Sequence, residues 1–240
     1  MIPIPDSLTM KRSRSAEKLL YDSARAWLTA EFRAPGTHAS DLLDPRQAVY
    51  RRLSPTPLSD REVGLFLVGK VLHAFVLQTV DGLAAVDINV TDEGSRPSDL
   101  GFSYSPDKIL GGTVRELKTN RVFKEPKDIE DMQEYVEQIL IYMAATSTRE
   151  AQLWVLFLNL RDEQRRTTPV FRGYDLSISD EDLERLRAYC KETAAGIDEA
   201  VSLNNPHLFP VCREWKCNRK FCPYFDQCQP EGRWEPISAK

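Results

Sequence analysis

The chain has 240 residues, with 32 lysines and arginines against 36 aspartates and glutamates, so its formal net charge is −4. Hydrophobic residues make up 42% and charged residues 28%, a mixture typical of a folded protein. The negative charge excludes a generally basic, histone-like nucleic-acid coat, although an enzyme that acts on DNA needs only a local basic groove. No stretch reaches the roughly 18 consecutive apolar residues of a membrane helix, and the first residues lack the pattern of a secretory signal. We therefore expect a cytoplasmic protein without membrane association.

Three helices are predicted in the first third of the chain. The first covers residues 16–32, and the second covers residues 39–53 and ends at a proline-rich segment. The third begins at Ser59, whose hydroxyl can cap the helix while Glu62 completes a capping box. Apolar residues lie nearly all around this third helix, so we expect it to be deeply buried.

The middle of the chain changes to the pattern of strands. Segments at 83–90, 100–110 and 113–119 are bounded by turn-forming residues, and Gly111-Gly112 between the last two indicates a hairpin turn. The elements predicted after this hairpin are a helix over 128–145, a central strand over 151–160, an outer strand over 168–178 and a capped helix over 179–201. This order predicts a mixed α/β domain.

The hairpin places two carboxylates opposite each other. If Gly111 and Gly112 form the turn, counting outward puts Asp107 directly opposite Glu116, where like charges destabilise the pair. A Mg²⁺ or Mn²⁺ ion held by both carboxylates would compensate. Lys118 points to the same face because side chains alternate along a strand, and it could stabilise developing negative charge. These are the parts of metal-assisted phosphodiester hydrolysis; the alternative is an exposed edge hairpin with solvated charges.

Four cysteines are crowded near the C-terminus. Cys212, Cys217, Cys222 and Cys228 lie within seventeen residues in the spacing C-x4-C-x4-C-x5-C. In an intracellular chain such crowding predicts a metal or cluster site rather than disulfides. Four thiolates can hold either an iron–sulfur cluster or zinc, although zinc ribbons more often show C-x2-C pairs. We expect the fifth cysteine, Cys190, to be a small buried residue inside a helix.

The hairpin resembles the signature of a nuclease family. Pro106-Asp107, followed after eight residues by Glu116-Leu117-Lys118, resembles the motif of the PD-(D/E)XK nucleases. The resemblance implies a restriction-endonuclease-like core, in which helices flank a mixed β-sheet with the active-site hairpin at its centre. It also implies that Asp107 and Glu116 hold the metal, that the Leu117 carbonyl adds a ligand, and that Lys118 is the catalytic lysine.

Three further segments resemble motifs of the RecB-like branch of this family, and in particular of the CRISPR-associated Cas-four exonucleases. Residues 38–52 resemble the N-terminal motif, residues 69–73 the Gly-x-x-x-His segment, and residues 138–142 the Gln-x-x-x-Tyr helix. The resemblance implies that His73 is a further metal ligand, whereas a lone histidine on a buried helix is usually a satisfied core residue. It assigns Gln138 and Tyr142 to the active-site wall, where they contact the DNA phosphate or order water.

The cysteine-rich tail resembles the iron–sulfur region of the same branch, which implies a 4Fe-4S cluster with a structural role. The family takes one of its four cysteines from the N-terminal motif, where this chain has Asp44. We expect Cys212 to replace that ligand, so that one loop binds the whole cluster. The alternatives are Asp44 as a ligand, zinc in place of the cluster, or no metal.

Other polar residues carry weaker expectations. His38 and His207 are expected to be capping or surface residues. Candidates for a positive surface that binds phosphates are Arg46, Arg51, Arg52, Lys118 and Arg121, although such charges often form a solvated helix face.

We expect a single nuclease domain over residues 1–240, made of a helical part (1–80), the core (81–203) and the cysteine-rich tail (204–240). The expected function is a metal-dependent DNA exonuclease that acts on single-stranded ends. The resemblance suggests CRISPR adaptation, with a CRISPR integrase complex as partner, or DNA repair and recombination. The alternatives are a non-catalytic nucleic-acid- or protein-binding subunit that keeps the fold and cluster, and a restriction-like endonuclease.

Overall fold

The computed structural model describes residues 14–30, 35–84, 90–91, 95–126, 129–161, 166–211, 216–217, 219 and 222–228. The chain forms two compact units, one of Met1–Phe32 with Pro57–Val71, the other of Arg33–Thr56 with Leu72–Lys240. None of the helices in the described part of the chain combines the length and hydrophobicity needed to cross a bilayer.

The smaller unit contains α1 (Arg14–Ala30) and the first half of α3 (Asp60–Ala84). The capping box predicted at the start of α3 is present. The Ser59 N–H donates to the Glu62 carboxylate at 2.8 Å, and the Glu62 N–H donates to the Ser59 hydroxyl at 3.3 Å. These two bonds satisfy donors that the first turn of a helix leaves without intrahelical partners.

The deep burial predicted for this helix is wrong for its first half. Leu65, Phe66 and Val71 are exposed. The physical reason is that this half belongs to the smaller unit, whose described residues form helices and include no sheet that could cover an apolar helix.

The larger unit is built on a five-stranded sheet in the order β1-β4-β5-β6-β7. Its strands are β1 (Val90–Thr91), β4 (Lys108–Leu110), β5 (Thr113–Asn120), β6 (Glu150–Arg161) and β7 (Thr167–Ser177). β5 and β6 run parallel and every other neighbouring pair is antiparallel. The fold is therefore the predicted mixed α/β sheet, with β5 at its centre and β7 at its edge.

The hairpin between β4 and β5 has the predicted register. Gly111 and Gly112 have φ angles of 59° and 80°, the left-handed conformation that a tight two-residue hairpin turn requires. The paired residues are Lys108 with Arg115, Ile109 with Val114, and Leu110 with Thr113.

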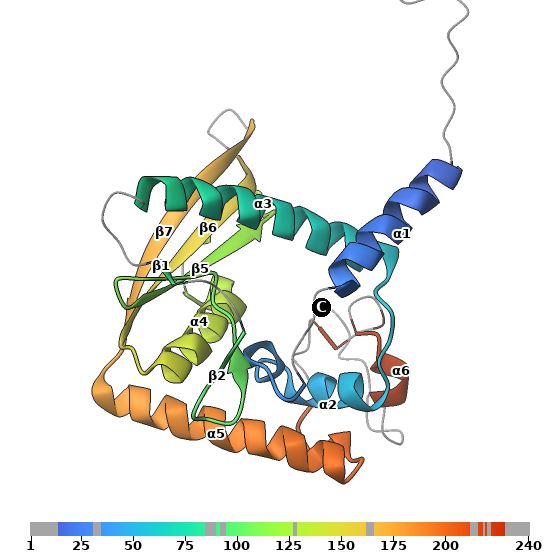
Figure 1. Cartoon of the computed structure of the whole chain (residues 1–240), viewed down its shortest axis with the longest axis vertical. Helices are drawn as coiled ribbons and strands as arrows, with labels where there is room; N and C mark the ends of the chain where they lie inside the picture. The colour runs from blue at the N-terminus through green and yellow to red at the C-terminus, as the bar shows by residue number, and fades with distance from the viewer. Residues whose placement is uncertain are drawn as a thin grey trace, which may run out of the picture. The chain divides into compact units, whose positions relative to one another are not determined.

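Helices bury one face of the sheet. α4 (Gln133–Thr146) connects β5 to β6 and contacts both strands, and α5 (Asp180–Ser202) packs against α4 on its far side (Figure 1). Alternation along the strands directs one set of side chains under α4. The fully buried residues of this layer are Val114, Leu153, Val155, Phe157, Ile139, Met143 and Ile197. α5 begins as predicted at Ser179, whose hydroxyl accepts the Asp182 N–H at 3.1 Å.

Shorter elements complete the unit. α2 (Pro45–Leu53) packs against α5, and a small ribbon pairs β2 (Arg96–Pro97) with β3 (Ser103–Tyr104). The remaining elements are α6 (Phe225–Cys228) and three 3₁₀ turns at Ala39–Asp41, Ile129–Met132 and Pro206–Leu208.

Three predicted elements have wrong boundaries. The strand over 100–110 is divided into β3 and β4, because Pro106 between them has no N–H for a sheet. The strand over 83–90 begins late: Leu83 and Ala84 still belong to α3, strand structure appears at Val90, and the intervening residues lie outside the described part. The helix over 39–53 is a 3₁₀ turn followed by α2, which starts at Pro45.

Truncation of the core should destabilise the larger unit. Ile197 is 0% exposed, so Ile197→Ala should lower the free energy of unfolding by about 2–5 kcal/mol through lost burial and a residual cavity. Leu203, at the end of the same helix, is 59% exposed, and Leu203→Ala should change that free energy by less than about 0.5 kcal/mol. Urea denaturation followed by circular dichroism measures both; equal effects would contradict the core assignment.

Candidate active site

The hairpin brings Asp107 and Glu116 together. The Asp107 N–H donates to Glu116 Oε2 at 3.3 Å, and the Leu117 N–H donates to Asp107 Oδ2 at 2.7 Å. The Lys118 ammonium donates to Glu116 Oε1 at 2.5 Å. Each carboxylate thus accepts a backbone N–H from the opposite arm of the hairpin. These bonds hold the two negative charges side by side.

His73 lies next to this pair. Its Nδ1 is 3.4 Å from Asp107 Oδ1, and both side chains are partly exposed. His73 comes from the part of α3 that belongs to the larger unit. The helix segment that contains His73 is distant in sequence from the hairpin of Asp107 and Lys118, and the fold brings the two segments together.

Burial controls the protonation of Glu116 and Lys118. Glu116 is only 3% exposed, and burial raises its pKa to about 7; Lys118 opposes this shift and the Asp107 carboxylate adds to it. Burial alone would lower the pKa of Lys118, but the neighbouring Glu116 outweighs it, so the pKa is raised. With both carboxylates ionised, the three groups carry a net charge of −1, which attracts a cation.

α4 forms a wall over the same site. The Gln138 side-chain amide donates to the Tyr142 hydroxyl at 2.9 Å, one helical turn away. The pKa of Tyr142 lies well above its ordinary value because the hydroxyl is buried and because the Glu116 and Asp107 charges face it. Tyr142 therefore stays a neutral hydroxyl beside the carboxylates, and the structure brings Gln138 and Tyr142 to the predicted location.

Tyr135 and Asn120 also lie at the site, although the sequence did not predict a role for them there. The Tyr135 hydroxyl donates to the Thr119 carbonyl at 3.4 Å. Burial raises the pKa of Tyr135, while the Lys118 ammonium and a hydrogen bond with Asn120 act against that shift. A sequence signal existed: Asn120 follows Lys118 at the strand period of two, and Tyr135 precedes Tyr142 by about two helical turns.

The donor types at this site suit Mg²⁺ or Mn²⁺. Asp107 and Glu116 offer carboxylate oxygens and His73 an imidazole nitrogen, the ligands that these ions accept. Within the described residues, no three His, Cys, Asp and Glu side chains already stand in a metal-binding arrangement. The buried excess of negative charge is what makes the residues fit a cation. Leu117 is placed by its N–H on Asp107, and a role for its carbonyl as ligand stays a prediction.

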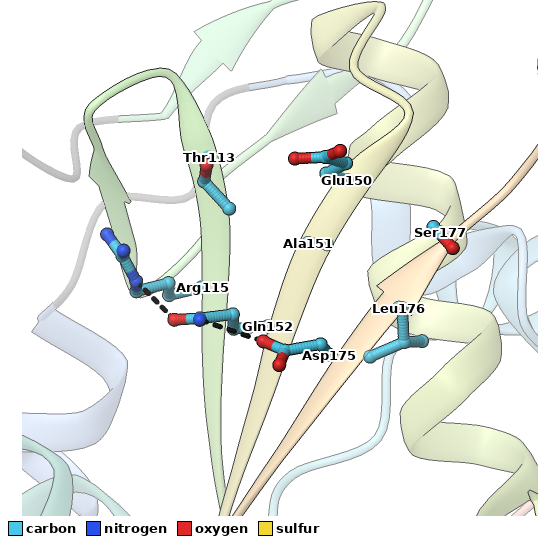
Figure 2. A pocket seen from close by; sticks show the side chains of 8 residues that line it. All are labelled: Thr113, Arg115, Glu150, Ala151, Gln152, Asp175, Leu176 and Ser177. Carbon is cyan, nitrogen blue, oxygen red and sulfur yellow. Dashed lines mark hydrogen bonds between the residues drawn. The ribbon is translucent and has the colours of Figure 1, made fainter.

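A separate pocket of about 300 Å³ lies on the opposite face of the sheet, since six of its eight lining residues alternate with the buried set. Figure 2 shows Arg115, Gln152 and Asp175 in a row across β5, β6 and β7. Arg115 Nε donates to Gln152 Oε1 at 2.6 Å, and Gln152 Nε2 donates to Asp175 Oδ1 at 2.9 Å. This row satisfies its own polar groups and holds none of the predicted site residues, so we interpret it as a structural link between strands.

The described cysteines of the tail are buried. Cys222 and Cys228 pack with Tyr50 and Tyr224, whose rings stack with their centroids 5.6 Å apart. Cys217 is buried as well, and Cys212 lies outside the described residues. Burial is the main cause that raises the pKa of Tyr50, and the neighbouring Cys228 raises this pKa further.

Hydrogen bonds fix the tail to α2. Arg46 donates to the Cys228 carbonyl at 3.4 Å and to the Phe209 carbonyl at 3.3 Å, and the Tyr50 hydroxyl donates to the Gln227 carbonyl at 3.1 Å. Arg46 is therefore buried, and its predicted place on a phosphate-binding surface is wrong.

Lys216 also ties the tail to two helices. Its ammonium lies 2.7 Å from Asp44 Oδ2 and 2.7 Å from Glu134 Oε1. Asp44, considered above as a cluster ligand, thus forms an ion pair with Lys216 in the structure. Glu134 belongs to the first turn of α4, so the tail contacts the helix that carries Gln138.

The other polar candidates have local roles. Arg51 pairs with Asp41 at 3.1 Å, and Arg52 pairs with Asp198 at 2.6 Å, so both hold elements of the fold together. The His38 N–H donates to Asp41 at 2.9 Å, the expected capping position, and the exposed His207 contacts Arg46. Cys190 is fully buried, as predicted, and burial raises the pKa of its thiol to about 11.

Comparison with known proteins gives a family match. The model of the PD-(D/E)XK nuclease superfamily matches residues 107–229, a segment that starts at Asp107 and spans just over half of the chain. None of the curated proteins matches the sequence significantly.

Several solved structures are similar to this chain. The crystal structure of SSO0001 has a TM-score of 0.52 and 16% identity, and the similarity covers 90% of this chain and 96% of that one. A phage-related exonuclease from Haemophilus somnus 129PT has a TM-score of 0.50 and 10% identity, over 72% of this chain and 98% of that one. An alkaline exonuclease from Laribacter hongkongensis has a TM-score of 0.46 and 17% identity, over 76% and 95%. The first two support the fold alone.

Metal binding should weaken in acid. Because burial raises the pKa of Glu116 to about 7, a Mn²⁺ ion must displace a proton below that pH, and its affinity should fall about tenfold per pH unit. Isothermal titration of the metal-stripped protein with Mn²⁺ between pH 5.5 and about 8.5 measures this dependence.

Two variants control this titration. Glu116→Gln should abolish most of the binding, and Glu150→Gln, which changes an exposed carboxylate on β6, should leave it unchanged. Binding that does not vary with pH would contradict the role of Glu116. The absence of binding at every pH would favour a non-catalytic module.

Proposed function

The chain belongs to the PD-(D/E)XK nuclease superfamily, and on this premise we propose that it is a metal-dependent DNA exonuclease of the RecB-like, Cas-four type that acts on single-stranded ends. The observation that carries the proposal is the pair of carboxylates, Asp107 and Glu116, held together in one hairpin with Glu116 buried and Lys118 bound to it. A structural hairpin gains nothing from opposed carboxylates, whereas a metal-dependent phosphodiesterase requires them.

Each residue of the site then has a defined role. Asp107, Glu116 and His73 would hold Mg²⁺ or Mn²⁺, with the Leu117 carbonyl as a further ligand. When bound, the ion would polarise the phosphate and lower the pKa of a water molecule. Lys118 keeps its proton, because its pKa is raised, and offers positive charge where negative charge develops on the phosphate.

The wall on α4 supplies neutral donors. The Gln138 amide points its N–H to the Tyr142 hydroxyl, and Tyr142 in turn has a hydroxyl proton to donate to a phosphate oxygen or to a water. Because the pKa of Tyr142 is raised, this hydroxyl adds no negative charge to a site that must accept a phosphodiester.

The cysteine-rich tail would hold a 4Fe-4S cluster through Cys217, Cys222, Cys228 and Cys212, with zinc as the alternative. Cys222 and Cys228 share one buried cluster, which supports the assignment, as does the anchoring of the tail by Arg46 and Lys216. The cluster would be structural, since the phosphodiester reaction transfers no electrons.

The biological pathway in which the nuclease would act is proposed from the sequence motifs alone. Residues 38–52, 69–73 and 138–142 carry the resemblance to Cas-four exonucleases, which supports a role in CRISPR adaptation beside an integrase complex. The same motifs fit a RecB-like nuclease of DNA repair and recombination.

Removal of the lysine should abolish most of the activity. Lys118→Ala should lower the rate of Mn²⁺-dependent degradation of a linear single-stranded oligonucleotide by about 10²–10³-fold, because it removes the positive charge nearest the phosphate. Lys191→Ala, an exposed lysine on α5, is the matched control and should keep the wild-type rate. A wild-type rate for Lys118→Ala would show that the catalytic assignment is wrong.

The form of the DNA separates the classes of nuclease. An exonuclease should leave closed circular single-stranded DNA intact while it degrades the same DNA after linearisation, because it needs an end. Gel electrophoresis of both forms after equal incubation measures this, and cleavage of the closed circle would instead identify an endonuclease.

Anaerobically purified protein should contain about four irons and four sulfides per chain and absorb visible light. Cys217→Ala and Cys228→Ala should lose the cluster, whereas Cys190→Ala should keep it, because Cys190 lies in the core of the sheet layer. Asp44→Asn should keep it as well if Cys212 is the fourth ligand. Colourless protein with stoichiometric zinc would overturn the iron–sulfur assignment.

A further inference from the structure

The segment 121–126, which follows β5, is held close to the sheet. Asn120 Oδ1 accepts the Val122 N–H at 3.0 Å, where the strand ends. At the next residue, the Arg161 N–H donates to the Phe123 carbonyl at 3.1 Å, which attaches the segment to the end of β6. The backbone of the segment is thus fixed immediately after the strand that carries Lys118.

The far end of the segment returns to the face of the sheet that bears Lys118. Glu125 forms two hydrogen bonds with Arg172 of β7, at 2.6 Å and 3.1 Å. Arg172 is in register with Val155, and Val155 is in register with Lys118, so the three side chains share one face. Two strand spacings, about 10 Å, separate Arg172 from Lys118 across the sheet.

Phe123 is presented to solvent by this arrangement. The residue is 52% exposed, although a large apolar residue is normally buried. The Arg161 guanidinium lies 4.5 Å from the ring centroid, a cation–π contact that holds the ring in place. This contact favours one placement of the ring on the surface, where its face is available to a ligand.

The sequence segments around Phe123 carry an excess of positive charge. Residues 120–126 and 161–172 contain six cationic side chains and three anionic ones, Glu125, Asp162 and Glu163, and Glu125 is paired with Arg172. Four of the cations lie in the described part of the chain and are exposed: Arg121, Lys124, Arg161 and Arg166. A chain with a net charge of −4 has thus placed a local excess of positive charge beside the active site.

We propose that Phe123, with Arg121, Lys124, Arg161 and Arg166 around it, is a platform that binds single-stranded DNA, one base stacking on the Phe123 ring while the cations contact the neighbouring phosphates. The proposal rests on the proposed nuclease function and adds the surface that feeds the substrate to it. Exposed aromatic rings in a basic setting bind single strands because every base offers a flat face and every nucleotide a negative charge.

The position of this Phe123 platform also fits a path into the site. Phe123 is five residues beyond Lys118, at most about 17 Å along an extended chain. A strand whose base stacks on Phe123 therefore has only a few nucleotides to reach the carboxylates. A duplex hides its base faces in the stack, so the platform selects single-stranded over double-stranded DNA.

The test is binding of a fluorescein-labelled oligothymidylate to the full-length protein in EDTA, which prevents hydrolysis. Phe123→Ala should raise the dissociation constant about tenfold by fluorescence anisotropy, and Phe123→Trp should restore the affinity. Phe171→Ala is the matched control, because Phe171 on β7 is 58% exposed and lies outside the platform; it should leave the affinity unchanged. Lys124→Gln should reduce the slope of log affinity against log salt by about 0.7.

A small substrate separates this proposal from the proposed function. Hydrolysis of bis(p-nitrophenyl) phosphate with Mn²⁺ needs Lys118, but the substrate is one phosphodiester without a nucleotide chain that extends to Phe123, so Phe123→Ala should retain the wild-type rate on it. Equal affinity of wild type and Phe123→Ala for the oligonucleotide would overturn the platform even if Lys118→Ala abolishes hydrolysis. If binding depends on Phe123 while neither substrate is hydrolysed, the platform is supported and the nuclease function fails.

Discussion

The enclosure of two like charges in one hairpin is the constraint on which the rest of this structure depends. Glu116 is buried beside Asp107, and burial and repulsion both raise its pKa. The fold accepts this cost because the hairpin backbone donates to both carboxylates and because Lys118 places an ammonium on Glu116. These contacts leave the two carboxylates with more negative charge than the single ammonium offsets, and this charge is what would favour a bound cation.

The cysteine-rich tail contributes to the same site through α4. Lys216 bridges Asp44, at the start of α2, and Glu134, in the first turn of α4. Gln138 lies one turn further along α4. Movement of the tail would therefore shift the helix that forms the active-site wall. If the tail holds the proposed cluster, these ion pairs would connect it to the wall of the candidate site without any contact between cluster and substrate.

The parts of the molecule that local rules determine were predicted from the sequence. The Gly111-Gly112 turn fixes the hairpin register, and the strand period of two then places the charges of β4 and β5. The exposure of Phe66 and the burial of Arg46 were not predicted. Both depend on which segments distant in sequence pack against the residue, and local patterns do not show this. Arg46 is buried by contacts with residues more than 160 positions later, whose carbonyls accept its hydrogen bonds.

The remaining geometry follows from the order of elements along the chain. β5 and β6 run parallel, so the connection between them must cross from one end of the sheet to the other, and α4 makes that crossing over one face. That face carries Glu116 and Lys118, since the alternate face holds the Arg115 row. Tyr135 and Tyr142, two turns apart on α4, must therefore lie over the charged residues. The parallel pairing of β5 and β6 thus brings the hairpin motif, with Glu116 and Lys118, and the α4 motif, with Gln138 and Tyr142, into one site.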